Sequence, residues 1–365
     1  MSLALEDLDF SYPERLVATE PVRDTRLMHV PAQCSEPREI DHTQLLEMFH
    51  PGDLWVINNT QVLRRRLLTN EGLEILFLRP LDAVASEWEV LCPASRWKAG
   101  HRQSAGGVEF SLLERGRPQR LSASQSLSED FFMKHAELPL PPYIQKARGE
   151  RRNRARDAQD YQTAWARVPG SLAAPTASFH YDEKFLAALR ARGVNVAEVT
   201  LHVGLGTFLP VTAATLDQHV MHAEYVCVPG STREAIAQTR RQGGCVVALG
   251  TTVARTLESA AQGLLRPSRN PNSSARVEES AFDDLSGETR LMLAPGSSWH
   301  EVDWLITNFH QPKSTLLALV ASFAGDLEKV KRAYQWAIAR EYRLFSYGHS
   351  SIWERGCPRL DSETT

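Results

Sequence analysis

The segment LITNFHQPKSTLLALVASFAG, residues 305–325, holds the pattern that decides the fold. Its first part is apolar enough to be a buried strand, and its second part, from Ser314 onwards, reads as an apolar helix. A short polar loop joins the two and contains Asn308, His310, Gln311 and Lys313. So many polar groups between two apolar elements suggest that the loop belongs to a functional site.

The same succession of strand and helix recurs along the chain from about residue 160. The strand-like runs are VNVAEVTLHVG (194–204), AEYVCVP (223–229), CVVALG (245–250), TRLMLAPG (289–296) and VDWLITNF (302–309). The helical patterns are DEKFLAALRARG (182–193), STREAIAQTRRQGG (231–244), TTVARTLESAAQGL (251–264) and DLEKVKRAYQWAIARE (326–341). Strands that alternate with helices predict an α/β body in which flanking helices cover a mixed sheet.

A different pattern occupies the region from about Leu67 to Phe110. Short strand-like runs follow one another there without a helix between them, namely LEILFLRP (73–80), EWEVLCPA (87–94) and GGVEFSLLERG (106–116). Such closely spaced strands predict a small antiparallel barrel or sandwich. The proline-rich ELPLPPYIQ (137–145) would follow as a stiff connector, and the basic run KARGERRNRARDAQD (146–160) as a mobile loop.

The composition is that of an ordinary globular protein. The 365 residues are 42% apolar and 23% charged, which is enough for two domains or for one domain with an insertion. A net charge of −3 argues against a protein that coats nucleic acid through bulk charge, although it allows a local basic patch. We expect a cytoplasmic protein, because MSLALEDLDF lacks a signal-peptide pattern and the longest apolar run, 316–321, is too short for a bilayer.

The segment TLHVGLGTFLPV (200–211) is the first candidate binding site. It runs from a strand into Gly204-Leu205-Gly206, where the lack of side chains would let a ligand approach the backbone. A dinucleotide fingerprint is excluded, because Leu209 stands where a third glycine is needed and Pro210 prevents a helix. The alternative is a purely structural glycine bend.

The segment ALGTTVARTLES (248–259) is the second candidate. Gly250, Thr251 and Thr252 link a strand to a helix N-terminus, whose free N–H groups suit a carboxylate or a phosphate. Arg255 and Glu258 follow in the first turns and could reach the same ligand. The alternative is simple capping of the helix by threonine.

The polar loop of the opening segment is the third candidate. Lys313 precedes a helix N-terminus that Ser314 or Thr315 can cap, and the helix dipole disfavours a cation there unless an anion is close. His310 can act as an acid, a base or a hydrogen-bond donor near neutral pH, although a structural histidine is the simpler interpretation of this residue alone.

Arginines and lysines form two clusters that could neutralise the phosphates of a nucleic acid, and the alternative is a solvated run of charge. The clusters consist of Arg64, Arg65 and Arg66, and of Lys146, Arg148, Arg151, Arg152, Arg154 and Arg156. The histidines share no helical spacing of the kind that binds a metal, so we expect no metal site.

Taken together, these segments resemble one family, the S-adenosylmethionine:tRNA ribosyltransferase-isomerases of the queuosine pathway. The matching segments occur in the family's order from about residue 8 to 350, and they are LPLPPYI (138–144), DYQTAWARVPGSLAAPTASFHY (160–181), VTLHVGLGTFLPV (199–211), MHAEYV (221–226), ALGTTVARTLES (248–259), SGETRLML (286–293), ITNFHQPKSTLLALVASFAG (306–325) and YRLFSYG (342–348).

The resemblance implies a fold and a reaction. The fold would be an α/β main domain, residues 1–65 and 157–365, with an inserted β-barrel domain, residues 66–156, that includes the proline-rich and basic connector. The reaction would transfer and isomerise the ribosyl group of S-adenosylmethionine onto 7-aminomethyl-7-deazaguanine at the tRNA wobble position. The products would be epoxyqueuosine-tRNA, adenine and methionine, so S-adenosylmethionine would be a consumed substrate. We expect a monomer that binds tRNA and needs no metal.

The resemblance also suggests roles for particular residues. Such a reaction needs a base, an acid and an anchor for the methionine carboxylate. The expected catalytic residues are His310, His202 and Lys313, with His222 behind them and with Lys313 and Arg255 holding a carboxylate or phosphate. The expected S-adenosylmethionine pocket comprises Gly204, Gly206, Thr207, Gly250, Thr251, Thr252, Arg255 and Asn308. The expected RNA contacts are Arg64, Arg65, Arg66, Arg151, Arg152 and Arg154.

Two motifs depart from the family's pattern. The chain reads INNTQV (57–62) where the family usually reads FNDT followed by Lys or Arg, so Asn59 replaces a carboxylate and Gln61 a cation. It reads LFSYGHS (344–350) where the family reads FFSYGDA, so His349 replaces a second carboxylate. The alternative function is therefore a divergent homologue that binds S-adenosylmethionine or RNA with an altered substrate or without catalysis, unless His349 takes over proton transfer.

Overall fold

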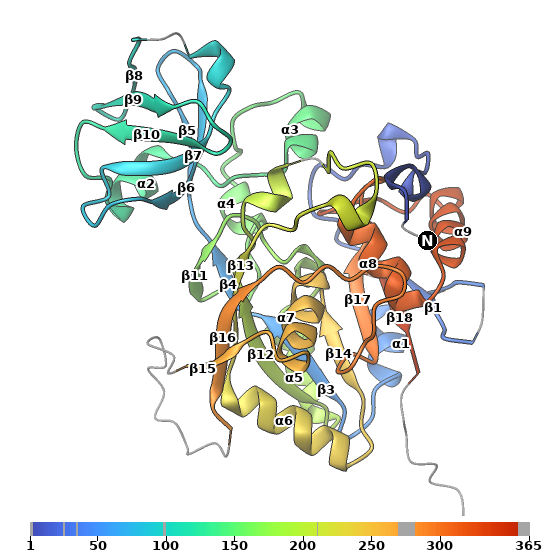
Figure 1. Ribbon diagram of the computed structural model, residues 1–365. Coiled ribbons are helices and arrows are strands. Elements are labelled where there is room, and N and C mark those ends of the chain that lie inside the picture. Colours follow the sequence, from blue (N-terminus) through green and yellow to red (C-terminus); the bar gives the residue numbers. More distant parts are fainter. Residues whose placement is uncertain are drawn as a thin grey trace, which may run out of the picture.

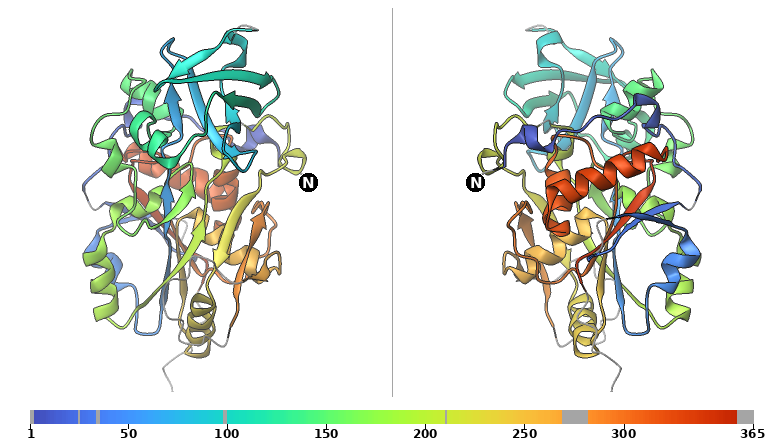
Figure 2. Two further views of the ribbon diagram at one scale, coloured as in Figure 1. Left: turned by 90° about the vertical axis from the view of Figure 1, so that its left-hand side faces the viewer. Right: turned by 90° about the vertical axis from the view of Figure 1, so that its right-hand side faces the viewer.

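The computed structural model describes residues 3–24, 26–33, 36–97, 100–209, 211–268 and 282–356. Figure 1 shows a large body built around one sheet and, at one end of it, a smaller β-rich part. The two further views in Figure 2 show the same division of the molecule from both sides. None of the helices in these ranges combines the length and the apolar character that crossing a membrane requires.

The body contains a mixed sheet that, within the described residues, has ten strands in the order β15-β16-β13-β12-β3-β14-β17-β18-β1-β2. Their bounds are β1 Leu27–Val30, β2 Arg38–Ile40, β3 Leu54–Asn58, β12 Asn195–Leu201, β13 Glu224–Val228, β14 Val246–Leu249, β15 Arg266–Ser268, β16 Asp284–Thr289, β17 Trp304–Asn308 and β18 Ser350–Glu354. The four central strands β12, β3, β14 and β17 are parallel neighbours. Their carboxyl ends therefore meet at one edge, which we call the carboxyl edge.

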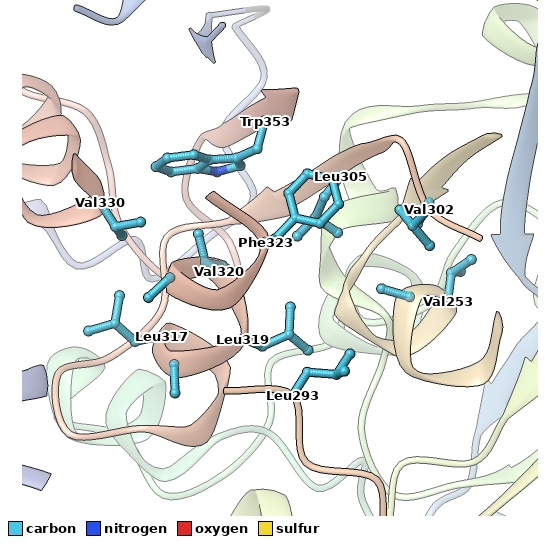
Figure 3. Packing of buried hydrophobic residues seen from close by; sticks show 14 of the residues in the cluster. Val253, Leu293, Val302, Leu305, Leu317, Leu319, Val320, Phe323, Val330 and Trp353 are labelled. Carbon is cyan, nitrogen blue, oxygen red and sulfur yellow. The ribbon is translucent and has the colours of Figure 1, made fainter. Parts of the chain in front are cut away.

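The central strands are apolar on both faces because helices cover both. Alternate residues of β3 belong to different cores: Leu54 and Val56 face one, and Trp55 and Ile57 face the other. Figure 3 shows part of the first core, in which Phe323 of the apolar helix lies against Leu305 of β17, and Leu317 of the same helix belongs to the same cluster. This double burial is the physical basis of the near-continuous apolar runs in the sequence.

The helices of the body divide between the two faces. Helices α6 Gly230–Arg241, α7 Thr251–Ala261, α8 Thr315–Ala324 and α9 Leu327–Ala339 contribute to the first core. Helices α1 His42–Glu47 and α5 Glu183–Ala191 contribute to the second. Local signals set their ends: Asp182 caps α5 by accepting a hydrogen bond from the Phe185 N–H, and Ser314 caps α8 by accepting one from the Leu317 N–H. The predicted α/β body is confirmed.

One strand prediction is wrong. The run TRLMLAPG was expected to be a strand, but β16 ends at its first residue, Thr289. The following residues form no strand, although Leu293 is buried in the first core. The apolar character of this run therefore reflects burial of an irregular segment and not sheet pairing, a distinction that short apolar runs do not make.

The smaller part is a nearly closed antiparallel sheet. In the described ranges its order is β5-β6-β7-β10-β9-β8, with bounds β5 Arg66–Leu68, β6 Glu74–Pro80, β7 Glu87–Leu91, β8 Gln103–Ala105, β9 Val108–Glu114 and β10 Gln119–Ala123. Its two outer strands approach each other just beyond β5, where the Asn70 N–H donates to the Ser104 carbonyl over 2.7 Å. Helix α2 Glu129–His135 packs Phe132 into the interior beside Phe77 and Trp88. This arrangement is barrel-like, which agrees with the first of the two predicted alternatives, a barrel or a sandwich.

The connector after the barrel is more regular than its sequence suggests. Helix α3 Pro142–Arg148 begins in the proline-rich run and extends into the run that was predicted to be a mobile loop, and helix α4 Asp157–Asp160 ends that run. The reason is a buried ion pair, in which the Arg148 guanidinium donates to both carboxylate oxygens of Asp157 over 2.8 and 2.9 Å. A small two-stranded sheet, β4 Thr60–Val62 with β11 Val168–Ser171, lies between body and barrel.

The chain leaves the body and returns to it at one place, which we call the neck. Arg66 and Glu137 exchange two backbone hydrogen bonds there, over 3.1 and 2.8 Å. The buried Arg66 guanidinium also pairs with the carboxylates of Glu74 and Glu137. The domain boundaries at residues 65/66 and 156/157 remain a prediction.

Candidate functional site

The carboxyl edge collects candidate residues that are far apart in the sequence. His202 directly follows β12, Asn59 and Thr60 follow β3, and Gly250 follows β14. Asn308 is the last residue of β17. Because β3 leads directly into β4 and then into the barrel, this edge is the one that faces the barrel in Figures 1 and 2.

His202 is held on three sides. Its Nδ1 lies 2.7 Å from the hydroxyl of Thr60, and its ring stacks on Tyr225 of the neighbouring strand with 5.6 Å between the ring centres. Gly170 of β11 approaches the ring so closely that a Cβ atom there would stand 2.6 Å from His202 Nε2. Burial lowers the His202 pKa to about 4, so the ring is neutral at pH 7 and can accept a proton.

His310 lies on the loop that follows β17 and is held in a different way. Its Nε2 is 2.9 Å from the Thr307 hydroxyl, and its backbone N–H donates to the hydroxyl of Tyr334 in α9. Burial lowers its pKa to about 4 as well. Because β3 and β14 separate β12 from β17 in the sheet, the structure does not place His310 next to His202.

Lys313 precedes a helix N-terminus, where a cation is expected to have an anion close by. The protein itself provides two such anions. Its Nζ lies 2.6 Å from a carboxylate oxygen of Glu6 and 3.2 Å from one of Asp9. Its backbone N–H donates to the carbonyl of Leu8. The loop before α8 is therefore fastened to the N-terminal segment, and a substrate anion would have to compete with two carboxylates for this cation.

The glycine turn after β12 is fixed by a buried ion pair. Gly204 donates its N–H to one carboxylate oxygen of Glu224 over 3.0 Å, and the other oxygen accepts from Arg255 Nη1 of α7. Arg255 Nε also donates to the Leu291 carbonyl. Glu224, which was not identified from the sequence, thus links Gly204 to Arg255.

The rest of this turn is more open. Gly206 packs near the ring of His222, to which a Cβ atom at the glycine would come within 3.4 Å, and Thr207 is exposed. Glu258, which was expected to reach the same ligand as Arg255, instead accepts hydrogen bonds from the backbone N–H groups of residues 300–302. That expectation is wrong, because the carboxylate points to a loop at the other end of α7.

Asn308 is part of a hydrogen-bond network that sequence reasoning did not assign. Its Oδ1 accepts from the Thr176 hydroxyl over 2.7 Å, and its Nδ2 lies 3.4 Å from the Gly348 carbonyl. His180 Nε2 donates to the same carbonyl over 2.8 Å, and burial lowers the His180 pKa to about 4. Thr176 and His180 both lie in DYQTAWARVPGSLAAPTASFHY (160–181), one of the segments that resemble the family. The sequence therefore did contain an indication that these two residues belong to the site.

Asn59 and His349, the residues at which carboxylates of the family pattern are replaced, each form a hydrogen bond with a carboxylate of this protein. Asn59 donates from Nδ2 to Glu198 over 2.8 Å and accepts from the Thr200 hydroxyl. His349 accepts at Nδ1 from the Arg343 N–H, so its Nε2 carries the proton and donates to Asp24 over 2.7 Å. Burial lowers the pKa of His349 despite the nearby carboxylate. Asp24 and Glu198 were not identified from the sequence.

Comparison with known proteins decides the family of this chain. The family model described as "Queuosine biosynthesis protein" matches residues 5–352. The chain belongs to the queuosine biosynthesis protein family. The match includes every candidate residue described above and both departures from the family's usual motifs.

Individual members of this family match over nearly their whole length. The chain is 40% identical to an S-adenosylmethionine:tRNA ribosyltransferase-isomerase of Azoarcus sp., with 97% of this chain and 99% of the relative covered. It is 37% identical to one of Chlorobaculum parvum, with 95% and 99% covered. The crystal structure of an S-adenosylmethionine tRNA ribosyltransferase from Thermotoga maritima is similar with a TM-score of 0.52, at 28% identity over 95% of this chain and 99% of that one.

The arginines that were expected to contact RNA in this family member fall into two groups. Arg65 and Arg66 are buried. Arg65 pairs with Glu129, and Arg66 pairs with Glu74 and Glu137, so both positive charges are balanced by carboxylates of the protein itself. Arg64 is partly exposed and donates to the Met133 carbonyl. The remaining three, Arg151, Arg152 and Arg154, have exposed side chains on the connector. Arg154 pairs with the exposed carboxylates of Glu20 and Glu150, whereas Arg151 and Arg152 pair with Glu74 and Glu137, the part-buried carboxylates that also bind Arg66.

Among the described residues, no group of three or more His, Cys, Asp or Glu side chains is arranged to hold a metal ion.

Proposed function

We propose that this protein is an S-adenosylmethionine:tRNA ribosyltransferase-isomerase. It transfers and isomerises the ribosyl group of S-adenosylmethionine onto 7-aminomethyl-7-deazaguanine at the wobble position of a tRNA, and releases adenine and methionine. The observation that carries the proposal is the match of 37–40% identity over at least 95% of this chain to relatives of that name. The neutral His202 and the glycine turn beside it at the carboxyl edge support it, because they provide a proton acceptor next to a place where a ligand can approach the backbone.

Within this proposal, His202 takes the proton-transfer role. It lies beside the glycine turn, and its low pKa keeps it in the basic, uncharged form at pH 7. His310 holds the loop that carries Asn308, since its ring and backbone are bonded to Thr307 and Tyr334. Lys313 fastens the same loop to Glu6 and Asp9 and contacts a substrate anion only after leaving them.

The tRNA contacts in this proposal come from the connector. Arg151, Arg152 and Arg154 are exposed on one short segment beside the neck, and the two carboxylate partners of Arg154, Glu20 and Glu150, are themselves exposed. Phosphates of an RNA can displace these two partners of Arg154 at little cost, because exposed ion pairs are weak. The protein acts on tRNA as a monomer in the cytoplasm.

The test is a complete reaction with defined substrates. The protein is incubated with S-adenosylmethionine and tRNA that bears 7-aminomethyl-7-deazaguanine, and the digested nucleosides are analysed by mass spectrometry while released adenine is quantified. We expect epoxyqueuosine and adenine in equal amounts. Binding of S-adenosylmethionine without either product would instead identify a divergent homologue, the alternative suggested by Asn59 and His349.

His202→Ala and His310→Ala separate the proposed roles. If His202 moves the proton, its alanine variant loses adenine release by about two orders of magnitude or more, whereas His310→Ala loses folding stability first. Near-normal turnover of His202→Ala would contradict the assignment.

A further inference from the structure

A cavity of about 200 Å³ lies where the barrel meets the connector, and it is separate from the residues described at the carboxyl edge. The barrel contributes Arg96, Gln103 and the turn at Gly72 between β5 and β6 to its lining. The connector contributes Arg151. Two guanidiniums from distant parts of the chain therefore share one small cavity, which is several times larger than the roughly 30 Å³ that a water molecule occupies in the liquid.

Gln103 has an unused hydrogen-bond donor at this cavity. Its side chain is more than nine-tenths buried, with 8% exposed, and its Oε1 accepts a hydrogen bond from the Thr69 hydroxyl over 2.8 Å. No atom of the described residues accepts a hydrogen bond from its Nε2, which carries two N–H groups. Because Thr69 holds Oε1 and Gln103 lines the cavity, Nε2 is left for a ligand that accepts hydrogen bonds.

Other arginines fix the backbone that carries the two guanidiniums. Arg96 is the last residue of the 3₁₀ helix Ala94–Arg96. Arg115 donates over 2.9 Å to the carbonyl of the first residue of this helix, and over 2.6 Å to the carbonyl of the residue after it. On the connector, the buried Arg66 donates to the carbonyl of Arg151 itself. Both guanidiniums therefore extend from fixed segments, so less conformational entropy is lost when they hold one ligand together.

The charges around the cavity favour an anionic ligand. Arg96 is exposed and forms no ion pair with any described residue. Arg151 lies 3.9 Å from a carboxylate oxygen of Glu74, and Arg66 already binds that oxygen over 2.9 Å. The lining also contains one carboxylate, that of the exposed Glu71, so two cations face one anion. A phosphate group suits such a cavity, because each guanidinium can donate two parallel hydrogen bonds to its oxygens.

We propose that this cavity binds one phosphate of the tRNA backbone between Arg96 and Arg151, with Gln103 Nε2 donating to the same group. The inference rests on the proposed function, which makes tRNA the substrate, and it extends the RNA contacts from the connector to the barrel. The barrel lies beside the carboxyl edge in Figures 1 and 2, so the cavity is on the side of the molecule where the wobble nucleotide has to bind. The phosphate would also accept from a buried amide that is otherwise costly to leave unpaired.

The experiment measures tRNA affinity over a range of salt concentrations for Arg96→Gln, for Arg151→Gln and for the variant with both substitutions. Arg102→Gln is the matched control, because Arg102 is another exposed arginine of the barrel but does not line the cavity. Each single substitution removes one positive charge from the surface. The melting temperatures of all variants should equal that of the wild type, since exposed charges contribute little to stability.

We expect Arg96→Gln and Arg151→Gln each to bind tRNA about ten-fold more weakly than the wild type, the loss that one hydrogen bond to a charged group commonly causes. Arg102→Gln should bind tRNA normally. Because both arginines hold one phosphate, the slope of log affinity against log salt concentration should decrease by about one in the double variant. A decrease of about two would indicate separate phosphates and overturn the shared site. Unchanged affinity of Arg96→Gln, or an equal loss in Arg102→Gln, would also overturn the inference.

Titration with inorganic phosphate distinguishes tRNA from a free ligand. Loss of phosphate binding in Arg96→Gln without any loss of tRNA affinity would overturn the assignment to tRNA in favour of free phosphate. Failure of the proposed function is distinguishable, because the wild type would then form no epoxyqueuosine. Normal epoxyqueuosine formation by the wild type, combined with a tRNA affinity that does not depend on Arg96, would overturn the inference alone. Absence of tRNA binding by the wild type would overturn both.

Discussion

The carboxyl edge of the body and the outer surface of the barrel use polar residues in opposite ways. At the edge, Arg255 and Glu224 are buried against each other and hold the glycine turn, and His202 is enclosed by neighbouring residues. On the barrel, the guanidinium of Arg102 pairs with Glu109 while both side chains are more than half exposed. The same kinds of group therefore fix one geometry at the edge and provide interchangeable surface charge on the barrel. The comparison predicts that matched substitutions will differ sharply between the two regions.

The largest expected difference is between Arg255→Ala and Arg102→Ala. Loss of Arg255 leaves the Glu224 carboxylate buried without its ion-pair partner, which typically costs about 3–5 kcal/mol of unfolding free energy. Loss of Arg102 breaks an exposed pair and should cost about 0–1 kcal/mol. Urea unfolding followed by circular dichroism measures both, and similar midpoints for the two variants would break the comparison.

A smaller effect on stability, but a specific one on activity, is expected for Gly170→Ala. The added Cβ would stand 2.6 Å from His202 Nε2, so the histidine ring must move, at about 1–3 kcal/mol for an overpacked site. Gly287→Ala is a matched control because the φ of Gly287, 156°, is within a degree of the φ of Gly170, 155°. A Cβ atom at Gly287 would meet only a Leu265 carbon, at 3.8 Å. Adenine release should fall in Gly170→Ala well beyond any loss in Gly287→Ala. Equal activities would show that the contact with His202 is unimportant.

The buried histidines of the body predict loss of stability in acid. Burial lowers the pKa of both His180 and His310 to about 4, below the value of about 6.5 in an unfolded chain. Between these values the unfolded chain binds more protons than the folded one, so stability is present above pH 6.5 and falls as the pH decreases toward 4. Each histidine should contribute a loss of about 1–2 kcal/mol at pH 5 relative to pH 7.5.

His310→Gln isolates one of these contributions. The glutamine cannot titrate, so the difference in urea midpoint between pH 7.5 and pH 5 should become smaller than in the wild type. A difference of unchanged size would mean that His310 does not carry the acid sensitivity of the body.

The smallest expected effect on stability is that of the paired substitution Arg151→Gln and Arg152→Gln on the connector. Both side chains are exposed, so the melting temperature should not change measurably. The affinity for tRNA should nevertheless fall, and the slope of its logarithm against the logarithm of salt concentration should decrease by about one for each phosphate that the variant no longer binds. An unchanged slope would exclude these arginines from the RNA interface.

The sequence predicts the body better than it predicts the connections within the site. Long alternating or apolar runs identify β12, β14, β17 and the helices beside them, because both faces of the central sheet are buried and periodicity records burial directly. The same reasoning misreads TRLMLAPG, whose apolar side chains are buried without strand pairing. It also expects a mobile loop at residues 146–160, where the Arg148–Asp157 pair supports helices.

The candidate site residues also divide into those that the sequence indicates and those that it does not. Gly250, Asn308 and His202 could be proposed because each lies at the end of a predicted strand, and the ends of parallel strands meet. Glu224 and Asp24 could not, since their importance comes from partners that are distant in the chain, Arg255 and His349. Arg65 and Arg66 show the converse, because a run of three arginines does not reveal that two of its members point inward.

The neck between body and barrel has a consequence for how separable the two parts are. The two points where the chain crosses it, Arg66 and Glu137, are neighbours joined by a pair of backbone hydrogen bonds. A segment whose ends lie side by side can be gained, lost or exchanged in a single genetic event without stretching the chain on either side. The barrel thus meets the body through two adjacent points of the chain, whereas the carboxyl edge is assembled from the ends of four separate strands.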